Sequence, residues 1–310
     1  GKALLMYLKR KADAYLNAWK SDPNRSPLII KGPRQVGKTE TIDYFAAHNY
    51  RSVVEINFVE EPKYRAITAD GYGANTIVRN ISLIDPAKKF IPGDTLIFFD
   101  EIQAHPDIAT ALKFFKIDGK YDVICSGSML GISYKQIESN SVGYKTDYEM
   151  RSLDFEEFLW GRGYDEAVIE SMFTHLCDAT PFSEVEMNVF STAFMDYCVL
   201  GGMPAVVASH IRTGTFEGTL QLQRQLILDY QEDIRKYAQG PDQARILNVF
   251  NHIPVQLAKE NKKFQISKVA SGARFKDYRG YVEWHETSAM FNICRGMSYP
   301  EMRLTDNYDV

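Results

Sequence analysis

Short apolar runs alternate with amphipathic stretches along the first half of the chain. These runs predict strands at 27–31, 52–57, 95–100 and 121–128, and we expect residues 146–150 to form the last strand. The stretches between them have helical character, for example at 41–47, 76–84 and 108–115. Because strands alternate with helices, the pattern predicts right-handed βαβ units and a parallel sheet, and therefore an α/β domain over residues 1–153.

The second half has a different pattern. Helical periodicity dominates from Asp154 to about Tyr237, as in 156–160, 184–200 and 219–237, with a sharp break at 201–204. We expect residues 154–240 to form a helical lid on the α/β domain.

The last segment, residues 241–310, predicts a winged helix-turn-helix. Short helical turns are expected at 245–250 and 254–260, with Pro254 at a helix start. Ser267 is placed to cap a short helix, Gly272 to form a turn, and a second helix is expected at 273–286. A strand predicted at 290–294 completes the outline.

A phosphate-binding loop directly follows the first predicted strand. Its sequence fits the pattern G-x-x-x-x-G-K-[ST] and consists of Gly32, Pro33, Arg34, Gln35, Val36, Gly37, Lys38 and Thr39. Glycines allow the backbone N–H groups to surround phosphate oxygens, lysine adds positive charge at the β- and γ-phosphates, and threonine provides a hydroxyl for Mg²⁺. These eight residues are therefore predicted to bind ATP, with a fortuitous glycine turn as the alternative.

Two carboxylates follow the apolar strand at 95–99. Open α/β sheets bind ligands at the carboxyl ends of their strands, so Asp100 is expected to bind Mg²⁺ together with Thr39. Glu101 is expected to polarise the attacking water, and adjacent strand residues point to opposite faces, which allows different roles. A solvated acidic strand end is the alternative. This pair favours a sheet with another strand inserted between this one and the first.

Ser126 and Ser128 end the next predicted strand. Either hydroxyl could reach the γ-phosphate or the attacking water, and we assign this catalytic role to Ser126, beside Lys38 and Glu101. A turn that only ends the strand is the alternative.

Composition restricts the remaining classes. The chain has 310 residues, 45% of them hydrophobic, a net charge of −4 and four cysteines without a C-x-x-C pair. It has no apolar run of about 18 residues and no secretory signal pattern. We therefore expect a cytoplasmic protein with reduced thiols and no membrane contact. Residues 2–20 suit an amphipathic surface helix.

A basic stretch contrasts with this acidic balance. Residues 259–279 carry seven basic and two acidic residues, a local charge of +5. Basic helix-turn-helix faces bind DNA backbones, and the side chains concerned are Lys262, Lys263, Lys268, Arg274, Lys276 and Arg279. The alternative is a segment that packs against the α/β domain or a neighbouring subunit while its lysines stay solvated.

The chain resembles a family of prokaryotic AAA-type ATPases that carry a P-loop, a helical lid, a winged helix and a nuclease-like C-terminal domain of unassigned function. The segments that carry this resemblance are 32–39, 99–103, 126–131, 153–160, 201–204, 229–233 and 253–261. The resemblance implies ATP and Mg²⁺ as cofactors, a protein partner or homo-oligomer, and a nuclease-like domain that would begin where this sequence ends.

One departure concerns the arginine that many relatives carry just before the last strand. This sequence has only Lys145 there, with Arg34 and Arg151 as weaker substitutes for an arginine finger.

Together these features predict a Mg²⁺-dependent ATPase in which Glu101 orients the attacking water. The chain lacks the guanine-recognition pattern Asn-Lys-x-Asp, which favours ATP over GTP. A slow nucleotide-gated switch or DNA-associated scaffold, and a small-molecule kinase, are the alternative classes.

Overall fold

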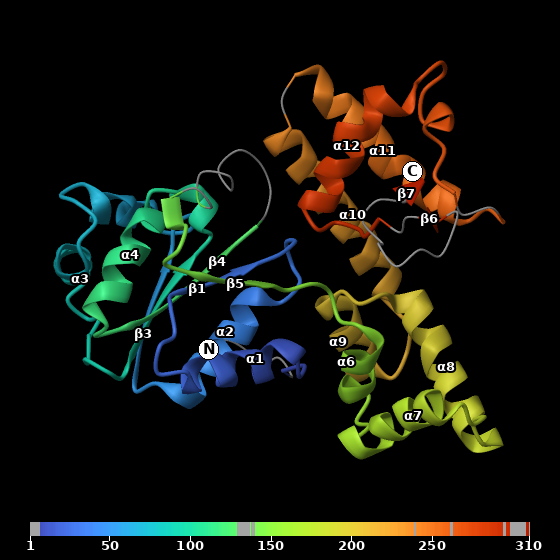
Figure 1. Cartoon of the computed structure of the whole chain (residues 1–310), viewed down its shortest axis with the longest axis horizontal. Coiled ribbons are helices and arrows are strands. Elements are labelled where there is room, and N and C mark those ends of the chain that lie inside the picture. The colour runs from blue at the N-terminus through green and yellow to red at the C-terminus, as the bar shows by residue number, and fades with distance from the viewer. Residues whose placement is uncertain are drawn as a thin grey trace. The chain divides into compact units, whose positions relative to one another are not determined.

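The computed structural model describes residues 7–128, 137, 140–238, 240–260, 263–293, 296–297 and 308–309. The chain divides into two compact units, Gly1–Asp233 and Ile234–Val310. The first contains a parallel sheet and a series of helices, and the described part of the second is mainly helical (Figure 1).

The sheet of the first unit has five parallel strands in the order β2-β3-β4-β1-β5. Their bounds are β1 Leu28–Lys31, β2 Ser52–Asn57, β3 Thr95–Asp100, β4 Asp122–Gly127 and β5 Thr146–Glu149. The predicted strands are confirmed to within a few residues at each end. The inserted strand is also confirmed, because β4 lies between β1 and β3.

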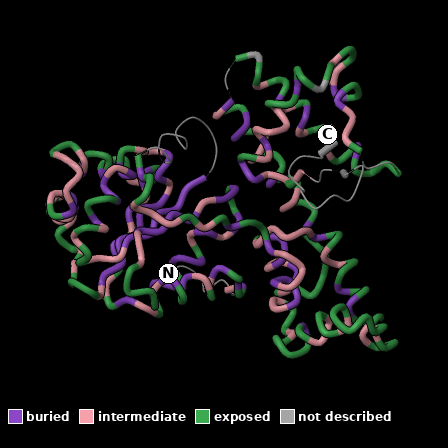
Figure 2. Tube along the Cα trace, in the orientation of Figure 1, coloured by how far each residue is buried: buried purple, intermediate pink, exposed green. Residues whose placement is uncertain are grey.

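Helices cover both faces of this sheet (Figure 1). Two of them, α1 (Lys11–Ser21) and α2 (Lys38–Asn49), pack on one face. The other face is covered by η1 (Pro62–Thr68), α3 (Ala74–Ile84) and α4 (Ile108–Asp118). Because side chains alternate along a strand, β1 sends Ile29 to one layer and Ile30 to the other. The strands are consequently the most buried part of the unit (Figure 2).

Five helices follow the sheet, as the pattern of residues 154–237 predicted. Their bounds are α6 Phe155–Gly161, α7 Glu166–Asp178, α8 Glu184–Leu200, α9 Pro204–Thr213 and α10 Thr219–Tyr237. The break at 201–203 separates α8 from α9, and α7 and α9 were not predicted. No helix in the described ranges has both the length and the apolar character that crossing a bilayer requires.

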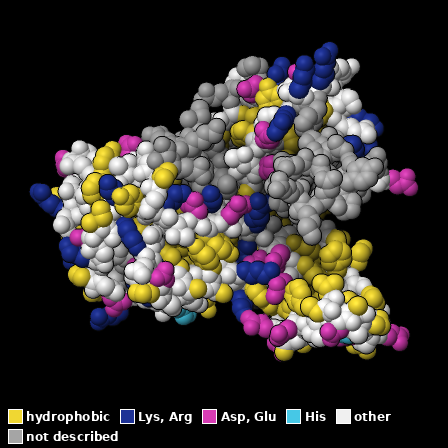
Figure 3. Space-filling view, in the orientation of Figure 1, with side chains coloured by type: hydrophobic (Ala, Val, Ile, Leu, Met, Phe, Trp, Pro, Cys, Tyr) yellow, Lys and Arg dark blue, Asp and Glu magenta, His cyan; other side chains and the backbone are white. Residues whose placement is uncertain are grey.

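The helices α7 and α8 leave much of their apolar surface in water, including Leu176 at 78% exposure and Val185 at 72% (Figure 3). Only Ile169 of α7 is buried, beside Leu159 of α6 and Ala193 of α8. Helix α8 also buries Phe190 and Leu200. Few buried side chains therefore hold α7, whereas α8 is packed into the unit.

The second unit contains α11 (Pro241–Leu257), η3 (Ile266–Lys268), α12 (Phe275–Thr287) and the antiparallel pair β6 (Gly296–Met297) and β7 (Tyr308–Asp309). Two clusters of buried side chains form its core: Val249, Ile266, Val269 and Tyr278 in one, and Ile234, Ala238 and Ile246 in the other.

Three predictions in this segment are wrong. Ser267 does not cap a short helix but lies inside η3, where Gln265 holds the cap position. Pro254 does not begin a helix but lies inside α11, where it leaves the helix without one N–H donor, and the buried Val249 and Gln256 keep this part of the helix packed. Residues 290–293 are not a strand, because Ala289 has a φ of 55° and the Met290 N–H donates back to the His285 carbonyl. The end of the predicted strand, Cys294, lies outside the described residues.

Candidate functional site

The predicted site residues meet at one edge of the sheet. The phosphate-binding loop follows β1, Asp100 ends β3, and Ser126 lies near the end of β4. These three strands are neighbours, and all are parallel, so their carboxyl ends converge. The topology therefore brings together side chains that are far apart in the sequence.

Glycines give the loop its path. A side chain at Gly32 would place a Cβ atom 2.0 Å from the carbonyl oxygen of Met150, so the close approach of loop and β5 end requires glycine. Gly37 begins α2 with a φ of 91°, in the left-handed region that favours glycine. Gln35 also has a positive φ, 61°, which is uncommon for a residue with a side chain.

Lys38 lies inside the loop. Its side chain is buried, and its Nζ donates to the carbonyl oxygens of Gly32 and Pro33 at 3.0 and 2.6 Å. Burial lowers the pKa of Lys38 to about 8, although the nearby charges of Glu101 and Asp100 oppose this shift. The loop thus encloses an ammonium group whose charge would be stabilised by an anion.

Asp100 is the centre of a polar cluster. Its buried carboxylate accepts hydrogen bonds from the Thr39 hydroxyl at 3.1 Å, the Asn57 amide at 3.3 Å and the Ser126 hydroxyl. The backbone N–H of Glu101 donates to it at 2.9 Å. The two residues predicted to bind Mg²⁺, Thr39 and Asp100, are therefore in direct contact.

The position of Glu101 differs from the prediction. Asp100 and Glu101 were expected to point to opposite faces of the sheet as adjacent strand residues. The strand ends at Asp100, and Glu101 turns away with a φ of 55°. Its carboxylate accepts a hydrogen bond from the buried Gln103 amide, whose oxygen receives the Ser128 N–H at 3.3 Å. Gln103 therefore orients Glu101, a role that we did not predict although Gln103 lies in the same short motif.

The two serines differ in their surroundings. Ser126 donates its hydroxyl to Asp100, and the Ser128 hydroxyl is buried without a hydrogen-bond partner within the described structure. The contact of Ser126 with a phosphate or a water stays a prediction.

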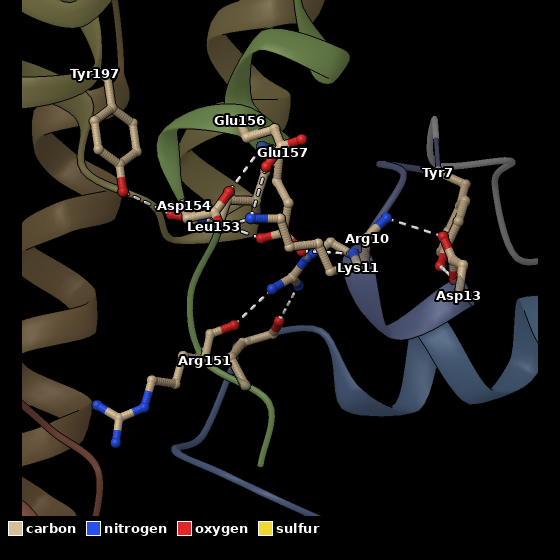
Figure 4. A network of polar contacts seen from close by, with 11 residues as sticks. Tyr7, Arg10, Lys11, Asp13, Arg151, Leu153, Asp154, Glu156, Glu157 and Tyr197 are labelled. Carbon is tan, nitrogen blue, oxygen red and sulfur yellow. Dashed lines mark hydrogen bonds and ion pairs between the residues drawn. The ribbon is translucent and has the colours of Figure 1, made fainter. Parts of the chain in front are cut away.

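The Arg10 side chain supports the phosphate-binding loop (Figure 4). Its buried guanidinium donates to the carbonyl oxygens of Val36 at 2.7 Å and Arg151 at 2.5 Å, and its Nε lies 3.2 Å from a carboxylate oxygen of Glu157. One side chain therefore joins the phosphate-binding loop, the segment after β5 and helix α6. No local pattern predicts this role of Arg10, because its partners are distant along the chain.

Glu157 serves two elements at once. It forms a capping box with Asp154 at the start of α6, where the Glu157 N–H donates to Asp154 at 2.9 Å and Glu157 accepts from the Asp154 N–H at 3.0 Å. It also accepts the Lys11 N–H at 2.8 Å (Figure 4). The buried charge of Arg10 is thereby matched by a carboxylate that the helix itself holds in place.

The three side chains considered for an arginine finger form ion pairs. Arg34 lies 2.7 Å from Asp233, Arg151 lies 2.5 Å from Glu149, and Lys145 lies 2.5 Å from Asp147. These ion pairs therefore do not favour any of the three side chains as an arginine finger.

The basic side chains predicted to bind DNA lie in the second unit. Lys263, Lys268, Arg274 and Lys276 are exposed, as is Arg279, which pairs with Glu283 at 2.6 Å one helical turn away. Lys262 lies outside the described residues.

Comparison with known proteins agrees with the geometry of the first unit. A family model described as an AAA domain matches residues 24–159, and one described as a domain of unknown function (DUF8612) matches residues 191–308. No curated protein matches the chain.

Among solved structures, the chain is similar to the Walker-type ATPase PABY2304 of Pyrococcus abyssi, with a TM-score of 0.50 and 14% identity over 91% of this chain and 90% of that chain. Looser likenesses are to PCH-2 of C. elegans (TM-score 0.34, 10% identity, 75% of this chain and 62% of that chain) and to the Aeropyrum pernix ORC1 protein in complex with DNA (TM-score 0.31, 9% identity, 90% and 82%). The AAA-domain match and the likeness to PABY2304 show that the first unit has the fold of AAA-like P-loop proteins.

The contact between Arg10 and Glu157 leads to a stability prediction. Replacing Glu157 by Gln removes the charge that matches a buried guanidinium, and breaking a buried pair costs about 3 kcal/mol. The neighbouring Glu156→Gln makes the same charge change at a partly exposed pair with Lys11, which should cost less than about 1 kcal/mol. Urea denaturation of both variants measures the difference, and equal losses would contradict a supporting role for the Arg10 pair.

Proposed function

We propose that this chain binds and hydrolyses ATP with the help of Mg²⁺. The observation that carries the proposal is the convergence of Lys38, Thr39, Asp100 and Glu101 at the carboxyl ends of β1 and β3. A buried cation in a glycine-rich loop, an acidic pair and a hydroxyl are the groups that phosphoryl transfer to water requires.

These residues fit both ATP and Mg²⁺. Lys38 is folded onto the loop carbonyls at 2.6–3.0 Å, so phosphate oxygens would replace weaker partners of the same ammonium group. Thr39 and Asp100 offer hard oxygen ligands 3.1 Å apart, the kind that Mg²⁺ prefers. When bound, the metal would neutralise charge on the phosphates.

Each residue has a defined task in this proposal. The N–H groups of the loop 32–39 and Lys38 bind phosphate oxygens, and Asn57 and Ser126 hold the Asp100 carboxylate in position. Glu101, oriented by Gln103, positions the attacking water and takes up its proton.

We also propose a division into an ATPase core at 1–153, a helical lid at 154–240 and a winged helix-turn-helix at 241–310. The helices α6 to α10 support the lid, and the series α11, η3, α12, β6 and β7 supports the winged helix. The slow nucleotide-gated switch remains the second candidate, and steady-state phosphate release by the unmodified chain separates the two.

The first prediction for this site concerns Lys38. Charge-assisted contacts contribute about 1.5–3 kcal/mol, so Lys38→Ala should lose at least about tenfold in ATP affinity at pH 7. The lowered pKa adds a pH dependence: above about pH 8 the nucleotide-free protein carries a neutral Lys38 and must take up a proton on binding ATP. The affinity of the unmodified chain should therefore fall as pH rises from 7 to 9.

Isothermal titration calorimetry in buffers of different ionisation enthalpy measures both the affinity and the proton uptake. The Lys38→Ala variant is the control, because its affinity should lack this pH dependence. If the unmodified chain and Lys38→Ala had equal affinity for ATP at pH 7, the proposal that ATP binds at this loop would be wrong.

The second prediction separates binding from hydrolysis. Glu101→Gln keeps the shape and hydrogen bonding of the side chain but removes its basicity, so phosphate release should fall by about 10²–10⁴-fold while ATP still binds. Asp107→Asn removes an exposed carboxylate from the same loop and should leave turnover unchanged. Unchanged turnover in Glu101→Gln would mean that another group positions the water.

We keep DNA as a proposed partner of the second unit, on the observation that the described basic side chains of η3 and α12 are exposed. Fluorescence anisotropy with duplex DNA should show binding at about 50 mM salt that weakens steeply as salt rises. Lys268→Glu with Lys276→Glu should weaken it on all sequences, whereas Lys63→Glu with Lys120→Glu, an equal charge change on the first unit, should not. An absence of binding by the unmodified chain favours a protein contact instead.

A further inference from the structure

One turn of α10 contacts the phosphate-binding loop through three side chains. Asp233 lies 2.7 Å from Nη1 of Arg34, the Tyr230 hydroxyl donates to the Arg34 carbonyl at 2.7 Å, and Asp229 accepts from the Gln35 amide at 2.6 Å. We call Asp229, Tyr230 and Asp233 the α10 clasp. Asp229 and Asp233 are four residues apart and therefore lie on one face of the helix.

The α10 clasp contacts a part of the loop that has an unfavourable backbone conformation. Both residues it contacts precede Gly37 and Lys38, and one of them, Gln35, has the positive φ that side chains disfavour. External contacts of this kind keep a loop in a sparsely populated conformation. The clasp is therefore part of the geometry of the proposed nucleotide site, and its Arg34–Asp233 contact is partly buried, whereas the hydrogen bonds of Asp229 and Tyr230 are exposed.

The two side chains of the ion pair in the clasp differ in their solvent exposure. The Asp233 side chain is only 3% exposed, whereas that of Arg34 is 47% exposed. A buried carboxylate depends strongly on its charge partner, and a half-exposed guanidinium is accessible to a competing anion. Arg34 also lies close enough to Lys38 for its charge to act there: burial is the main cause of the lowered pKa of Lys38, and Arg34 lowers it further.

We propose that Arg34 is shared between Asp233 and the phosphates of the bound nucleotide, so that nucleotide binding releases the α10 clasp. This inference rests on the proposed nucleotide site. Phosphate groups at the loop attract the Arg34 guanidinium, and fork-shaped contacts to phosphate are a strength of arginine. As Arg34 turns to the phosphates, Asp233 loses this ion pair, and its burial on the loop becomes unfavourable.

The released turn has a fixed place in the chain. Helix α10 continues to Tyr237, and the second compact unit begins at Ile234, directly after Asp233. Ile234 is itself buried in the core of that unit. The clasp is therefore the last segment of the first unit, and its release changes the restraint on the helix that leads into the second. By linkage, whatever strengthens the clasp weakens nucleotide binding, by at most the same factor.

The first measurement is the affinity for the non-hydrolysable analogue AMP-PNP with Mg²⁺, determined by calorimetry. Asp233→Asn keeps the side-chain shape and removes the competitor for Arg34, so its affinity should rise by about fivefold or more, the lower end of ordinary coupling between sites. Glu232→Gln removes an equal charge from an exposed position one residue away and should leave affinity unchanged. Equal tightening in both variants, or weakening in Asp233→Asn, would overturn the inference.

The second measurement is hydrogen exchange of residues 226–237. Exchange should increase when AMP-PNP and Mg²⁺ bind to the unmodified chain. It should also increase in Arg34→Gln without any nucleotide, a result that does not depend on the proposed function. If the unmodified chain binds no nucleotide, the proposed function fails. If it binds nucleotide while exchange in this segment stays unchanged, only the clasp proposal fails.

Discussion

The Asp100 carboxylate is buried at the end of β3, and burial of a charge is costly unless several donors surround it. The donors come from separate parts of the fold: Thr39 from α2, Asn57 from the end of β2 and Ser126 from β4. Strand order, loop path and the start of α2 must all be correct before these groups can meet. The same carboxylate that is proposed to bind Mg²⁺ is thus also a structural centre, and its removal would disturb the sheet edge as well as the chemistry.

The phosphate-binding loop is held from two sides by different kinds of contact. Arg10 donates to the Val36 carbonyl from a buried position and is matched by Glu157, which makes this support a permanent part of the core. The α10 clasp instead contacts the side chains of Arg34 and Gln35, which are at least partly solvated. In this proposal the buried contact of Arg10 holds the shape of the loop, while the contacts of the α10 clasp are exchanged.

Much of the fold could be predicted because its signals are local. Apolar runs predicted four of the five strands, whereas β5 (Thr146–Glu149) has no such run. The G-x-x-x-x-G-K-[ST] pattern located Lys38 and Thr39 at a strand end. The supporting residues Arg10 and Asp233 could not be predicted, because a lone arginine or aspartate has no periodicity and its partner is distant along the chain. Pro254 was predicted at a helix start because proline is favoured there, whereas α11 continues past it to Leu257, and the packing of the buried Val249 offsets the N–H donor that proline lacks.

The strand order has a consequence for how the protein acquires its shape. Ile30 of β1 pairs with Ser126 of β4 and with Tyr148 of β5, while β2, the next strand in the sequence, pairs only with β3. Contacts between distant segments form late, because a long loop must close before they are made. During synthesis from the N-terminus, the glycine-rich loop therefore emerges long before the strands that flank β1. The last of the groups proposed to bind ATP and Mg²⁺ is Ser126 of β4, so a growing chain has no complete candidate site until β4 has been synthesised. A nucleotide at that site would stabilise only a sheet in which β1, β3 and β4 have already paired.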